Sequence, residues 1–481
     1  MDERPQRPGR GRPDGVARRR GAGPTLARLI AVRVLERVER VRAYSDIALH
    51  HALAQSNLSG QDRALATDLV YGTLRWRGRI DHVLSQFVER KLADLESMVL
   101  TTLRLGAYQI LFSDRIPNIA AVDEAVRCAR AVGADRATGL VNAVLRRVAS
   151  DGGAVRFPLL EDEPVLHLQH ALSLPTWIAE RWIADYGAEA AANLARICND
   201  PPPFTVRANR QRTNRETLLG SLLPDFPEAA PCRMAPDGLV LGHKGDPGRD
   251  ARFRDGDYTV QDEASQLVVE MLDPQPSDRV LDVCAAPGTK TTAIAERLGE
   301  DGSVLALDRH AARLNLVARA ARRLGLRGIS TLQCDANVPL PELPFAAEQP
   351  IPKGGSRFDR VLVDAPCSGL GAMRRNPDAR WRVRPTDPAQ LAEVQQSILA
   401  NAAVTVRPGG VLVYSTCSVL REENEAVVEQ LLARYEDFRL ATSAELPTAL
   451  APTLDESGYM RCHPHIHGTD GFFAARLIRE T

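Results

Sequence analysis

Two cysteines in this chain each follow a short apolar run directly. The run "VLVDAPCSGLG" (361–371) carries Cys367, and the run "VLVYSTCS" (411–418) carries Cys417. Such nearly continuous apolar runs are typical of strands that are buried on both faces of a parallel sheet. Each cysteine is therefore expected at the carboxyl end of a strand, where open parallel sheets bind their ligands. A thiol at that edge can act as a nucleophile once it is deprotonated.

Methyl transfer to carbon-5 of a pyrimidine is a reaction that needs such a thiol. An oxygen or nitrogen acceptor already has a lone pair, but carbon-5 becomes nucleophilic only after another group has added to carbon-6. A thiolate that adds there leaves again once a base has removed the carbon-5 proton. One cysteine can add while the other assists, and the chemistry alone leaves open which does which. The remaining cysteines are expected to be small buried side chains: Cys128, Cys198, Cys232, Cys284, Cys334 and Cys462.

Three aspartates stand at the ends of three successive predicted strands: Asp308, Asp335 and Asp364. A single aspartate at such a place is often only a helix cap. Three in succession suit a nucleoside that carries a positive charge, and Asp308, about twenty residues after Gly288, can accept both hydroxyls of a ribose. The cofactor that this pattern predicts is S-adenosylmethionine, which has a sulfonium and an amino group.

The loop "CAAPGTK" (284–290) after the first predicted strand is expected to hold that cofactor. Its small residues let the backbone approach a ligand closely, and the next helix presents its N-terminus to a negative group. A Walker-type phosphate loop is excluded, because it needs glycines where this chain has Cys284 and Thr289. The expected cofactor-binding residues are Cys284, Ala285, Ala286, Pro287, Gly288, Thr289, Lys290, Asp308, Asp335 and Asp364.

The elements that must position these residues form an α/β domain over 256–481. Five apolar runs alternate there with helical stretches, which predicts βαβ units and a parallel, Rossmann-like sheet. Residues 344–356 are expected to be a loop insertion before the fourth strand.

The residues before this domain predict three further segments. Residues 25–155 carry apolar side chains at three- and four-residue steps, which predicts an all-α domain in which Asn118 caps a helix. Residues 156–255 predict a small α/β linker module. Residues 1–24, rich in arginine, proline and glycine, predict a disordered basic tail.

The composition limits the class of protein. Lys+Arg and Asp+Glu both number 61, so the formal net charge is zero and any basic surface for nucleic acid must be local. The sequence has no CxxC pair, no secretory signal and no apolar run long enough to cross a membrane. We expect a monomeric cytoplasmic protein with reduced thiols and no bound metal.

Several motifs together resemble the Sun/Fmu-type RNA cytosine-5 methyltransferases. They are "CAAPGTKT", "DAPCSGLG", "RRNPDARW", "YSTCS" and "HGTDGFFAARL", in this order. In the helical region "DLVYGTLRW" and "GLVNAVLRRV" resemble the NusB-like RNA-binding domain of the RsmB-type ribosomal RNA members. The resemblance covers about residues 25–480. It implies a class I methyltransferase domain, S-adenosylmethionine as methyl donor, and RNA as substrate.

The resemblance also assigns roles that the chemistry left open. It implies that Cys417 is the nucleophile and that Cys367 aids release of the product. Asp364 is expected to reach N3 of the target base, and Lys290 to orient Asp364 or the substrate. Two positions depart from the usual pattern: Thr289 and Leu370 stand where glycine and threonine are common, and Thr289 puts close cofactor contact at that residue in doubt.

Two further stretches allow more than one interpretation. "RRNPDARWRVR" (374–384) carries five arginines and a tryptophan that could hold phosphates and stack a base, or be a solvated basic loop. The same choice applies to Arg75, Arg77, Arg79, Arg146 and Arg147 in the helical region. "HPHIH" (463–467) could ligate zinc, but it has no partner cysteine motif, so a surface loop is expected.

The function expected from this sequence is formation of 5-methylcytosine in ribosomal RNA, most naturally of the small subunit. The target base must leave its stack to reach Cys417. One alternative is a transfer RNA cytosine-5 methyltransferase. Another is a non-catalytic RNA-binding assembly factor, which the intact Cys417, Cys367 and Asp364 argue against.

Overall fold

The computed structural model describes residues 23–242, 245, 247–341 and 358–481. The predicted basic tail, up to residue 22, and the predicted insertion at 344–356 lie outside the described residues. The chain divides into two compact units. The first unit contains the chain up to Ala43, Ile47–Thr73 and Val83–Val155, and the second contains Tyr44–Asp46, Leu74–His82 and Arg156–Thr481.

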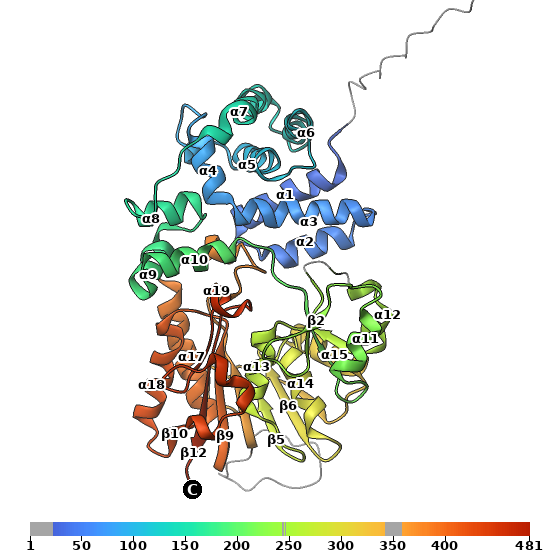
Figure 1. Ribbon diagram of the computed structural model, residues 1–481, viewed down its shortest axis with the longest axis vertical. Coiled ribbons are helices and arrows are strands. Elements are labelled where there is room, and N and C mark those ends of the chain that lie inside the picture. The colour runs from blue at the N-terminus through green and yellow to red at the C-terminus, as the bar shows by residue number, and fades with distance from the viewer. Residues whose placement is uncertain (1–22, 243–244, 246, 342–357) are drawn as a thin grey trace, which may run out of the picture. The chain divides into compact units, whose positions relative to one another are not determined.

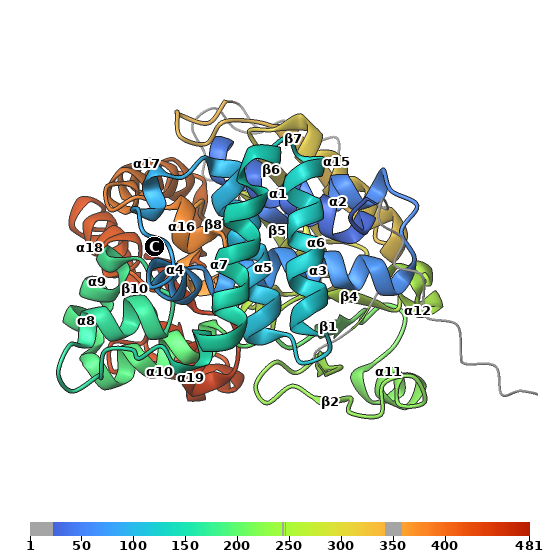
Figure 2. The ribbon, with the colours of Figure 1, turned by 90° about the horizontal axis from the view of Figure 1, so that it is seen from above.

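The first unit is helical, and its core is built around α5 (Ser97–Phe112), most of whose middle is buried. Helix α5 packs against α1, α6 and α7, which Figure 2 shows around it. A Cβ at Gly106 would lie 2.4 Å from a methyl group of Leu145, so the absence of a side chain at this position favours the close packing of α5 and α7. The helices up to Asp151 are α1 (Leu26–Val41), α2 (Ser45–Ala54), α3 (Gly60–Arg75), α4 (Arg77–Ser85), α5, α6 (Asn118–Ala131) and α7 (Thr138–Asp151), and most of α4 belongs to the second unit.

A helical segment of the second unit, from Pro164 to Cys198, packs in an apolar cluster that it shares with Leu370, Met373 and Leu420. Trp182, which is fully buried, lies at the centre of this cluster with Leu174 and Ile178. The helices are α8 (Pro164–Leu166), α9 (Thr176–Tyr186) and α10 (Ala188–Cys198).

A small antiparallel sheet follows, with strand order β2-β3-β1-β4. Its core joins Val206, Leu239 and Tyr258 to Leu218 and Leu222 of the helix beside it. The elements are β1 (Thr205–Ala208), α11 (Arg215–Leu222), β2 (Ala230–Pro231), β3 (Gly238–Val240), α12 (Ala251–Asp255) and β4 (Tyr258–Val260).

A large mixed sheet with the order β10-β12-β9-β8-β5-β6-β7 forms the rest of the second unit. Strands β5 to β9 are parallel, whereas β10, β11 and β12 pair antiparallel. The strands are β5 (Arg279–Asp282), β6 (Ser303–Asp308), β7 (Ile329–Gln333), β8 (Phe358–Asp364), β9 (Val406–Thr416), β10 (Phe438–Leu440), β11 (Met460–Cys462) and β12 (Phe472–Arg479).

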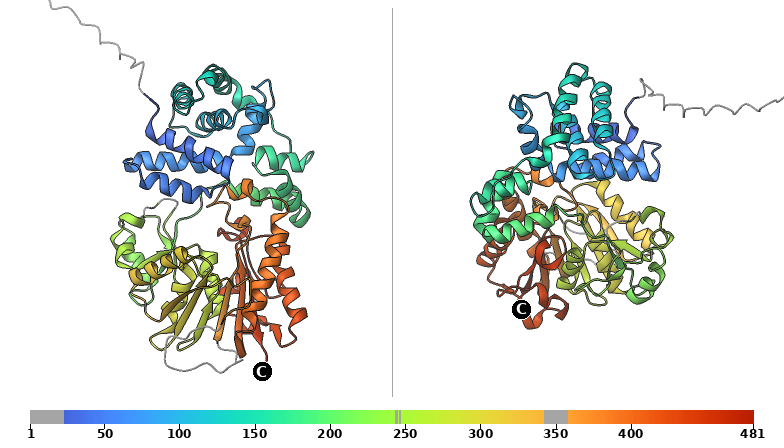
Figure 3. Two further views of the ribbon diagram at one scale, coloured as in Figure 1. Left: turned by 180° about the vertical axis from the view of Figure 1, so that it is seen from behind. Right: turned by 45° about the horizontal axis from the view of Figure 1, so that its top comes forward.

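Helices cover both faces of the large sheet (Figures 1 and 3). Alternate strand residues point to opposite faces: Leu362 joins the core under α13 and α14, while Val361 and Val363 join the core under α17 and α18. This burial on two sides explains the continuous apolar runs of the sequence. The helices are α13 (Glu263–Leu272), α14 (Thr289–Leu298), α15 (Ala311–Leu324), α16 (Ala379–Arg382), α17 (Asp387–Ala403), α18 (Glu425–Arg434) and α19 (Pro464–His467).

The predicted fold class is confirmed: an all-α part precedes a small α/β module and a Rossmann-like domain. The prediction missed the three antiparallel strands after residue 437. The predicted cap at Asn118 is wrong, because Asn118 is the first helical residue and Pro117 takes the cap position. Among the described residues, no helix combines the length and the apolar character needed to cross a membrane.

Candidate active site

The loop after β5 lies tightly against α15. Gly288 has φ +106° and forms the N-cap of α14, and a Cβ there would lie 3.0 Å from Cα of Val317. A glycine is therefore required for this conformation and for this close approach. Ala285 and Ala286 are buried beside it and keep the loop narrow.

Asp308 ends β6 beside this loop and is almost fully buried. Its Oδ1 accepts the backbone N–H of His310 at 2.8 Å, and the guanidinium of Arg313 lies 3.4 Å from Oδ2. Arg313 also donates to the Ala286 carbonyl at 2.8 Å. One arginine thus joins the end of β6 to the loop after β5.

Asp282, the last residue of β5, is a buried carboxylate that was not among the residues predicted from the sequence. Its Oδ2 accepts the hydroxyl of Thr291 at 2.7 Å, but its Oδ1 has no hydrogen-bond partner among the described residues. Burial, and to a smaller extent the charge of Asp364, raises the pKa of Asp282 to about 7. A buried acceptor without a partner suits a positively charged or hydrogen-bond-donating ligand.

Asp335, the third predicted acid, is exposed in the turn after β7. Its carboxylate accepts the N–H of Asn337 at 3.0 Å, which is a local turn contact. Together, the glycine-narrowed loop, Asp308 and the unpartnered Asp282 oxygen fit a cationic nucleoside such as S-adenosylmethionine. Of the three predicted acids, Asp308, Asp335 and Asp364, Asp335 is the most exposed to solvent.

Lys290 and Asp364 form an ion pair at the end of β8. Lys290 Nζ lies 2.7 Å from Asp364 Oδ2, and the Ser415 hydroxyl donates to Asp364 Oδ1 at 2.9 Å. The ammonium group also lies 5.0 Å from the ring centroid of Phe472, in a cation–π contact. Lys290 is buried while Asp364 is half-buried, so the carboxylate is held in a fixed orientation at the edge of the sheet.

The two cysteines of the opening motifs lie side by side. Cys367 Sγ is 3.3 Å from Cys417 Sγ, and both residues are half-buried. Their hydrogen bond, followed by burial, raises the pKa of the Cys367 thiol. Burial, followed by Asp282, raises the pKa of Cys284, which keeps that thiol neutral in the cofactor loop.

Two glycines hold the loop of Cys417. The N–H of Gly371 donates to the Cys417 carbonyl at 2.9 Å, and Gly471 N–H donates to the Gly371 carbonyl at 2.8 Å. A Cβ at Gly371 would lie 2.1 Å from the Gly471 carbonyl oxygen. The "SGLG" and "TDGFF" segments therefore pack backbone against backbone at the cysteines.

Glu423, just after the Cys417 loop, is a second buried acid at the site that the sequence alone did not reveal. Its carboxylate is fully buried and accepts hydrogen bonds from the serine that follows each cysteine, Ser368 and Ser418. The acidic string "REENE" after "YSTCSVL" was the available signal, but acids in such a string are usually solvated.

The arginine motif 374–384 is largely structural, so the predicted phosphate-binding role is wrong for three of its arginines. Arg374 donates to the carbonyls of Gly468 and Pro201, Arg375 pairs with Asp262 and Asp470, and Arg380 is fully buried on carbonyl groups. Trp381 donates to the Leu74 carbonyl, and the guanidinium of Arg77 lies over its ring.

The arginines at positions 75, 77 and 79 belong to the second unit and also make internal contacts. Arg75 donates to the Arg374 carbonyl, Arg77 lies over the Trp381 ring, and Arg79 lies over Phe157. A solvated face is therefore wrong for these three.

The histidines of 463–467 pack on one another around α19. Burial lowers the pKa of His463 to about 4, so its ring is neutral at physiological pH. Within the part of the chain that the structure describes, no group of three or more His, Cys, Asp and Glu is arranged to hold a metal ion.

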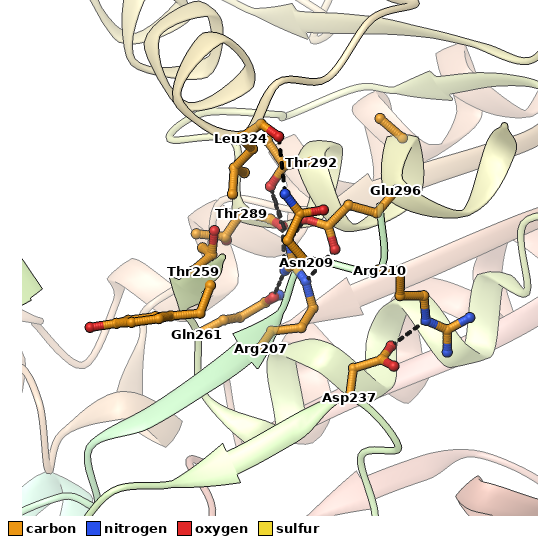
Figure 4. Close-up of polar contacts among 12 residues, drawn as sticks. Arg207, Asn209, Arg210, Asp237, Thr259, Gln261, Thr289, Thr292, Glu296 and Leu324 are labelled. Carbon is orange, nitrogen blue, oxygen red and sulfur yellow. Dashed lines mark hydrogen bonds and ion pairs between the residues drawn. The ribbon is translucent and has the colours of Figure 1, made fainter. Parts of the chain in front are cut away.

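The small sheet is fastened to the helix of the cofactor loop (Figure 4). Arg207 of β1 is buried and pairs with Glu296 of α14 at 2.8 Å. The same guanidinium donates to the Thr289 carbonyl at 3.0 Å, in the first turn of α14, and to Gln261. Asn209 donates to the Leu324 carbonyl at the end of α15.

Comparisons with known proteins agree with this architecture. The family described as 16S rRNA methyltransferase RsmB/F matches residues 269–478, the NusB family matches 25–150, and the ferredoxin-like domain of RsmF/B-like methyltransferases matches 174–246. The chain is 39% identical over 458 residues to the probable ribosomal RNA small subunit methyltransferase B of Bacillus subtilis, covering 95% of this chain and 99% of that protein.

Solved structures with the same fold include the crystal structure of PH0851. It matches with a TM-score of 0.76 and 27% identity, over 94% of this chain and 99% of its own. A methyltransferase homologue protein from Pyrococcus horikoshii matches with a TM-score of 0.53 and 26% identity, over 66% of this chain and 99% of its own.

Proposed function

This chain belongs to the RsmB/F family of 16S rRNA methyltransferases, whose methyl donor is S-adenosylmethionine, and we propose that it methylates carbon-5 of a cytosine in small-subunit ribosomal RNA. The observation that carries this proposal is the pair of thiols, Cys367 and Cys417, 3.3 Å apart at the strand ends beside Asp364. An enzyme that methylates oxygen or nitrogen has no use for such a pair. We also propose that the protein is cytoplasmic, because its proposed substrate, ribosomal RNA, is found in the cytoplasm.

Cys417 is the nucleophile in this proposal. Its deprotonated sulfur bonds to carbon-6 of the cytosine, and the electron pair of the carbon-5–carbon-6 double bond becomes available at carbon-5. Carbon-5 takes the methyl group, which the donor's sulfonium supplies with loss of its sulfur–carbon bond. A base then removes the carbon-5 proton, the double bond forms again, and the bond between Cys417 and carbon-6 breaks.

Cys367 assists this last step, since its raised pKa keeps it in the thiol form that can protonate or hydrogen-bond the departing sulfur. Asp364 is directed at N3 of the base, where a proton shared with the ring stabilises the charge that develops after addition. Lys290 orients Asp364 through the 2.7 Å ion pair. Residues 284–290, Asp308 and Asp335 surround the methyl donor.

The domain boundaries near residues 155 and 255 belong to the same proposal. The helical domain up to about 155 and the module up to about 255 bind RNA, and the domain from 256 catalyses the transfer. RNA recognition by shape and phosphate contacts suits such an arrangement.

Substitution of each cysteine tests the proposal. Cys417→Ala should abolish transfer of label from S-adenosylmethionine to ribosomal RNA, because no adduct can form. Cys367→Ala should instead accumulate a protein–RNA adduct, seen as a slowly migrating band on a denaturing gel, because release fails. Cys128→Ala, in α6 of the first unit and in neither cysteine motif, is the control and should methylate normally.

Near-normal turnover of Cys417→Ala would disprove the assignment. Deproteinised small-subunit RNA and assembled subunits should be compared as substrates, and digestion of the product to nucleosides should give 5-methylcytosine. Any other methylated nucleoside would reject the cytosine-5 assignment while leaving the family unchanged.

A further inference from the structure

One buried carboxylate joins the two cysteine loops. Glu423 accepts the backbone N–H of Ser368 at 2.7 Å and the hydroxyls of both Ser368 and Ser418. The two serines follow Cys367 and Cys417 directly in the sequence. The side chain of Glu423 is fully buried, so water does not compete for these bonds.

Neighbouring groups close the same network. Gln395 of α17 donates to Glu423 at 3.2 Å and to the Pro366 carbonyl at 2.9 Å, which ties the loop of Cys367 a second time. Asn424 donates to the Ser418 carbonyl at 3.1 Å and accepts the hydroxyl of Thr416. The residue after each cysteine therefore binds Glu423 itself. The residue before each cysteine binds a side chain next to Glu423, which is Gln395 for Pro366 and Asn424 for Thr416.

A buried carboxylate is costly unless several donors bind it, so this arrangement serves more than local packing. Two strand-end loops that are 50 residues apart in the sequence have no covalent reason to keep their thiols adjacent. The pairing of β8 with β9 and the hydrogen bond from Gly371 to the Cys417 carbonyl bring the two loops together, and a single acceptor that binds the residue after each thiol then sets the positions of the thiols within them. The negative charge of Glu423 also contributes to raising the pKa of Cys367, which disfavours a second thiolate there.

We propose that Glu423 is a positioning residue that holds the thiols of Cys367 and Cys417 at their working separation by binding Ser368 and Ser418. It does not touch the base or the methyl donor. The inference rests on the proposed function for its use in catalysis, but the separation itself can be measured without RNA.

Disulfide closure reports the separation directly. Diamide oxidises two adjacent thiols to a disulfide and is itself reduced to the hydrazine, and the cross-linked Cys367–Cys417 peptide can be quantified by mass spectrometry. Glu423→Gln replaces the charged acceptor with a neutral amide, so the hydrogen bonds that Ser368 and Ser418 make with it lose their charge-assisted strength. The closure rate should fall on the order of tenfold, since hydrogen bonds to a buried charge typically contribute this much or more. Loss of the Glu423 charge also lowers the pKa of Cys367, which alone would speed oxidation, so the serine variant described below, which keeps that charge, separates the two effects.

The matched control is Glu429→Gln, an exposed glutamate on the next helix that pairs with Arg421. It should close the disulfide at the wild-type rate. In methylation assays, Glu423→Gln should lower kcat on the order of tenfold and leave the KM for RNA and for S-adenosylmethionine within about twofold. A role in packing alone would lower the fraction of active protein without slowing closure in the folded fraction.

The serines provide a second arm if Glu423→Gln does not fold. The double variant Ser368→Ala, Ser418→Ala removes the same bonds and should slow closure to a similar extent. Closure at the control rate in folded Glu423→Gln, or in the double variant, would overturn the inference. Slow closure in an enzyme that makes no 5-methylcytosine would retain it and reject the proposed function instead.

Discussion

Asp364 is held from two sides, by Lys290 on one oxygen and by Ser415 on the other. A carboxylate with a hydrogen bond to each oxygen cannot rotate freely, so the orientation of Asp364 toward a substrate is fixed before the substrate binds. Such preorganisation is the usual source of electrostatic catalysis. The cation–π contact of Lys290 with Phe472 also holds the lysine against β12. The phenylalanine of the "TDGFF" motif thus helps to position Lys290 at the site.

The raised pKa of Asp282 predicts how the stability of the protein depends on pH. Its pKa is raised to about 7 by burial, so the folded protein keeps a proton that the unfolded chain, with a carboxyl pKa near 4, has lost. The stability from this proton is present at low pH and disappears as pH rises through about 7. Between about pH 4 and 7 the free energy of unfolding of wild type should therefore fall by about 1.4 kcal/mol per pH unit relative to Asp282→Asn.

Thermal unfolding at pH 5 and pH 8 checks this. The wild-type melting temperature should drop more between the two conditions than that of Asp282→Asn. The control is Asp335→Asn, whose side chain is exposed and whose variant should follow the wild-type curve. Identical pH dependence of wild type and Asp282→Asn would show that Asp282 is ionised in the folded state.

At the scale of elements, the Arg207–Glu296 pair connects β1 of the small sheet to α14 of the cofactor loop. Both side chains are almost fully buried, and the guanidinium reaches the Thr289 carbonyl next to Gly288. The small module and the loop after β5 are thus fastened at one point, inside the second unit.

Breaking this pair should be severe. Arg207→Met leaves Glu296 buried without its partner, which should cost about 3–5 kcal/mol of unfolding free energy in chemical denaturation. Arg210→Met removes a partly exposed pair with Asp237 and should cost less than about 1 kcal/mol. The double variant Arg207→Met, Glu296→Leu should recover part of the loss, and no recovery would mean that other contacts of Arg207 dominate.

The sequence predicted the elements with continuous apolar patterns well. The runs that became β5 to β9 and the loop at 284–290 were placed because buried parallel strands have a distinctive pattern. Strands β10 and β11 have three residues each, too few to show an alternation. Strand β12 was noticed only as part of a motif, since its burial on nearly every residue does not distinguish a strand from a helix.

The environments of single polar residues were harder to predict. Arg380 and Arg375 occur in a motif that reads as a basic surface, yet carbonyls and aspartates from distant segments bury them. The same holds for Glu423, whose partners come from residues 368 and 395. No local pattern encodes partners that are separated by dozens of residues, so only the tertiary structure reveals which charges are buried.

At the scale of the whole molecule, a formal net charge of zero conceals a basic face. Helix α15 contains no aspartate or glutamate, and it carries exposed arginines at positions 313, 319 and 322, with Arg327 just beyond its end. Arg313 contacts the cofactor loop, so this face adjoins the proposed site. Phosphates are the natural counterpart of such a surface.

Charge reversal on α15 should weaken RNA binding. The triple variant Arg319→Glu, Arg322→Glu, Arg327→Glu should lower affinity for single-stranded ribosomal RNA, and the slope of log affinity against log salt should become shallower by about 0.7 for each lost contact. Arg421→Glu with Arg439→Glu is the control, because glutamates already neutralise these arginines. An unchanged salt slope in the triple variant would place the RNA elsewhere.

Strand β12 lies between β10 and β9, although it comes last of the three in the sequence. Its neighbour β9 leads directly into the loop of Cys417. Until residues 472–479 have been synthesised, β9 therefore has no strand to pair with on the side that β12 occupies in the folded sheet. During translation the helical first unit can fold early, whereas the sheet must wait with an open, hydrogen-bonding edge. A premature stop codon even a few residues before Phe472 should therefore yield an aggregation-prone product that chaperones and proteases remove, and not a shortened enzyme with partial activity.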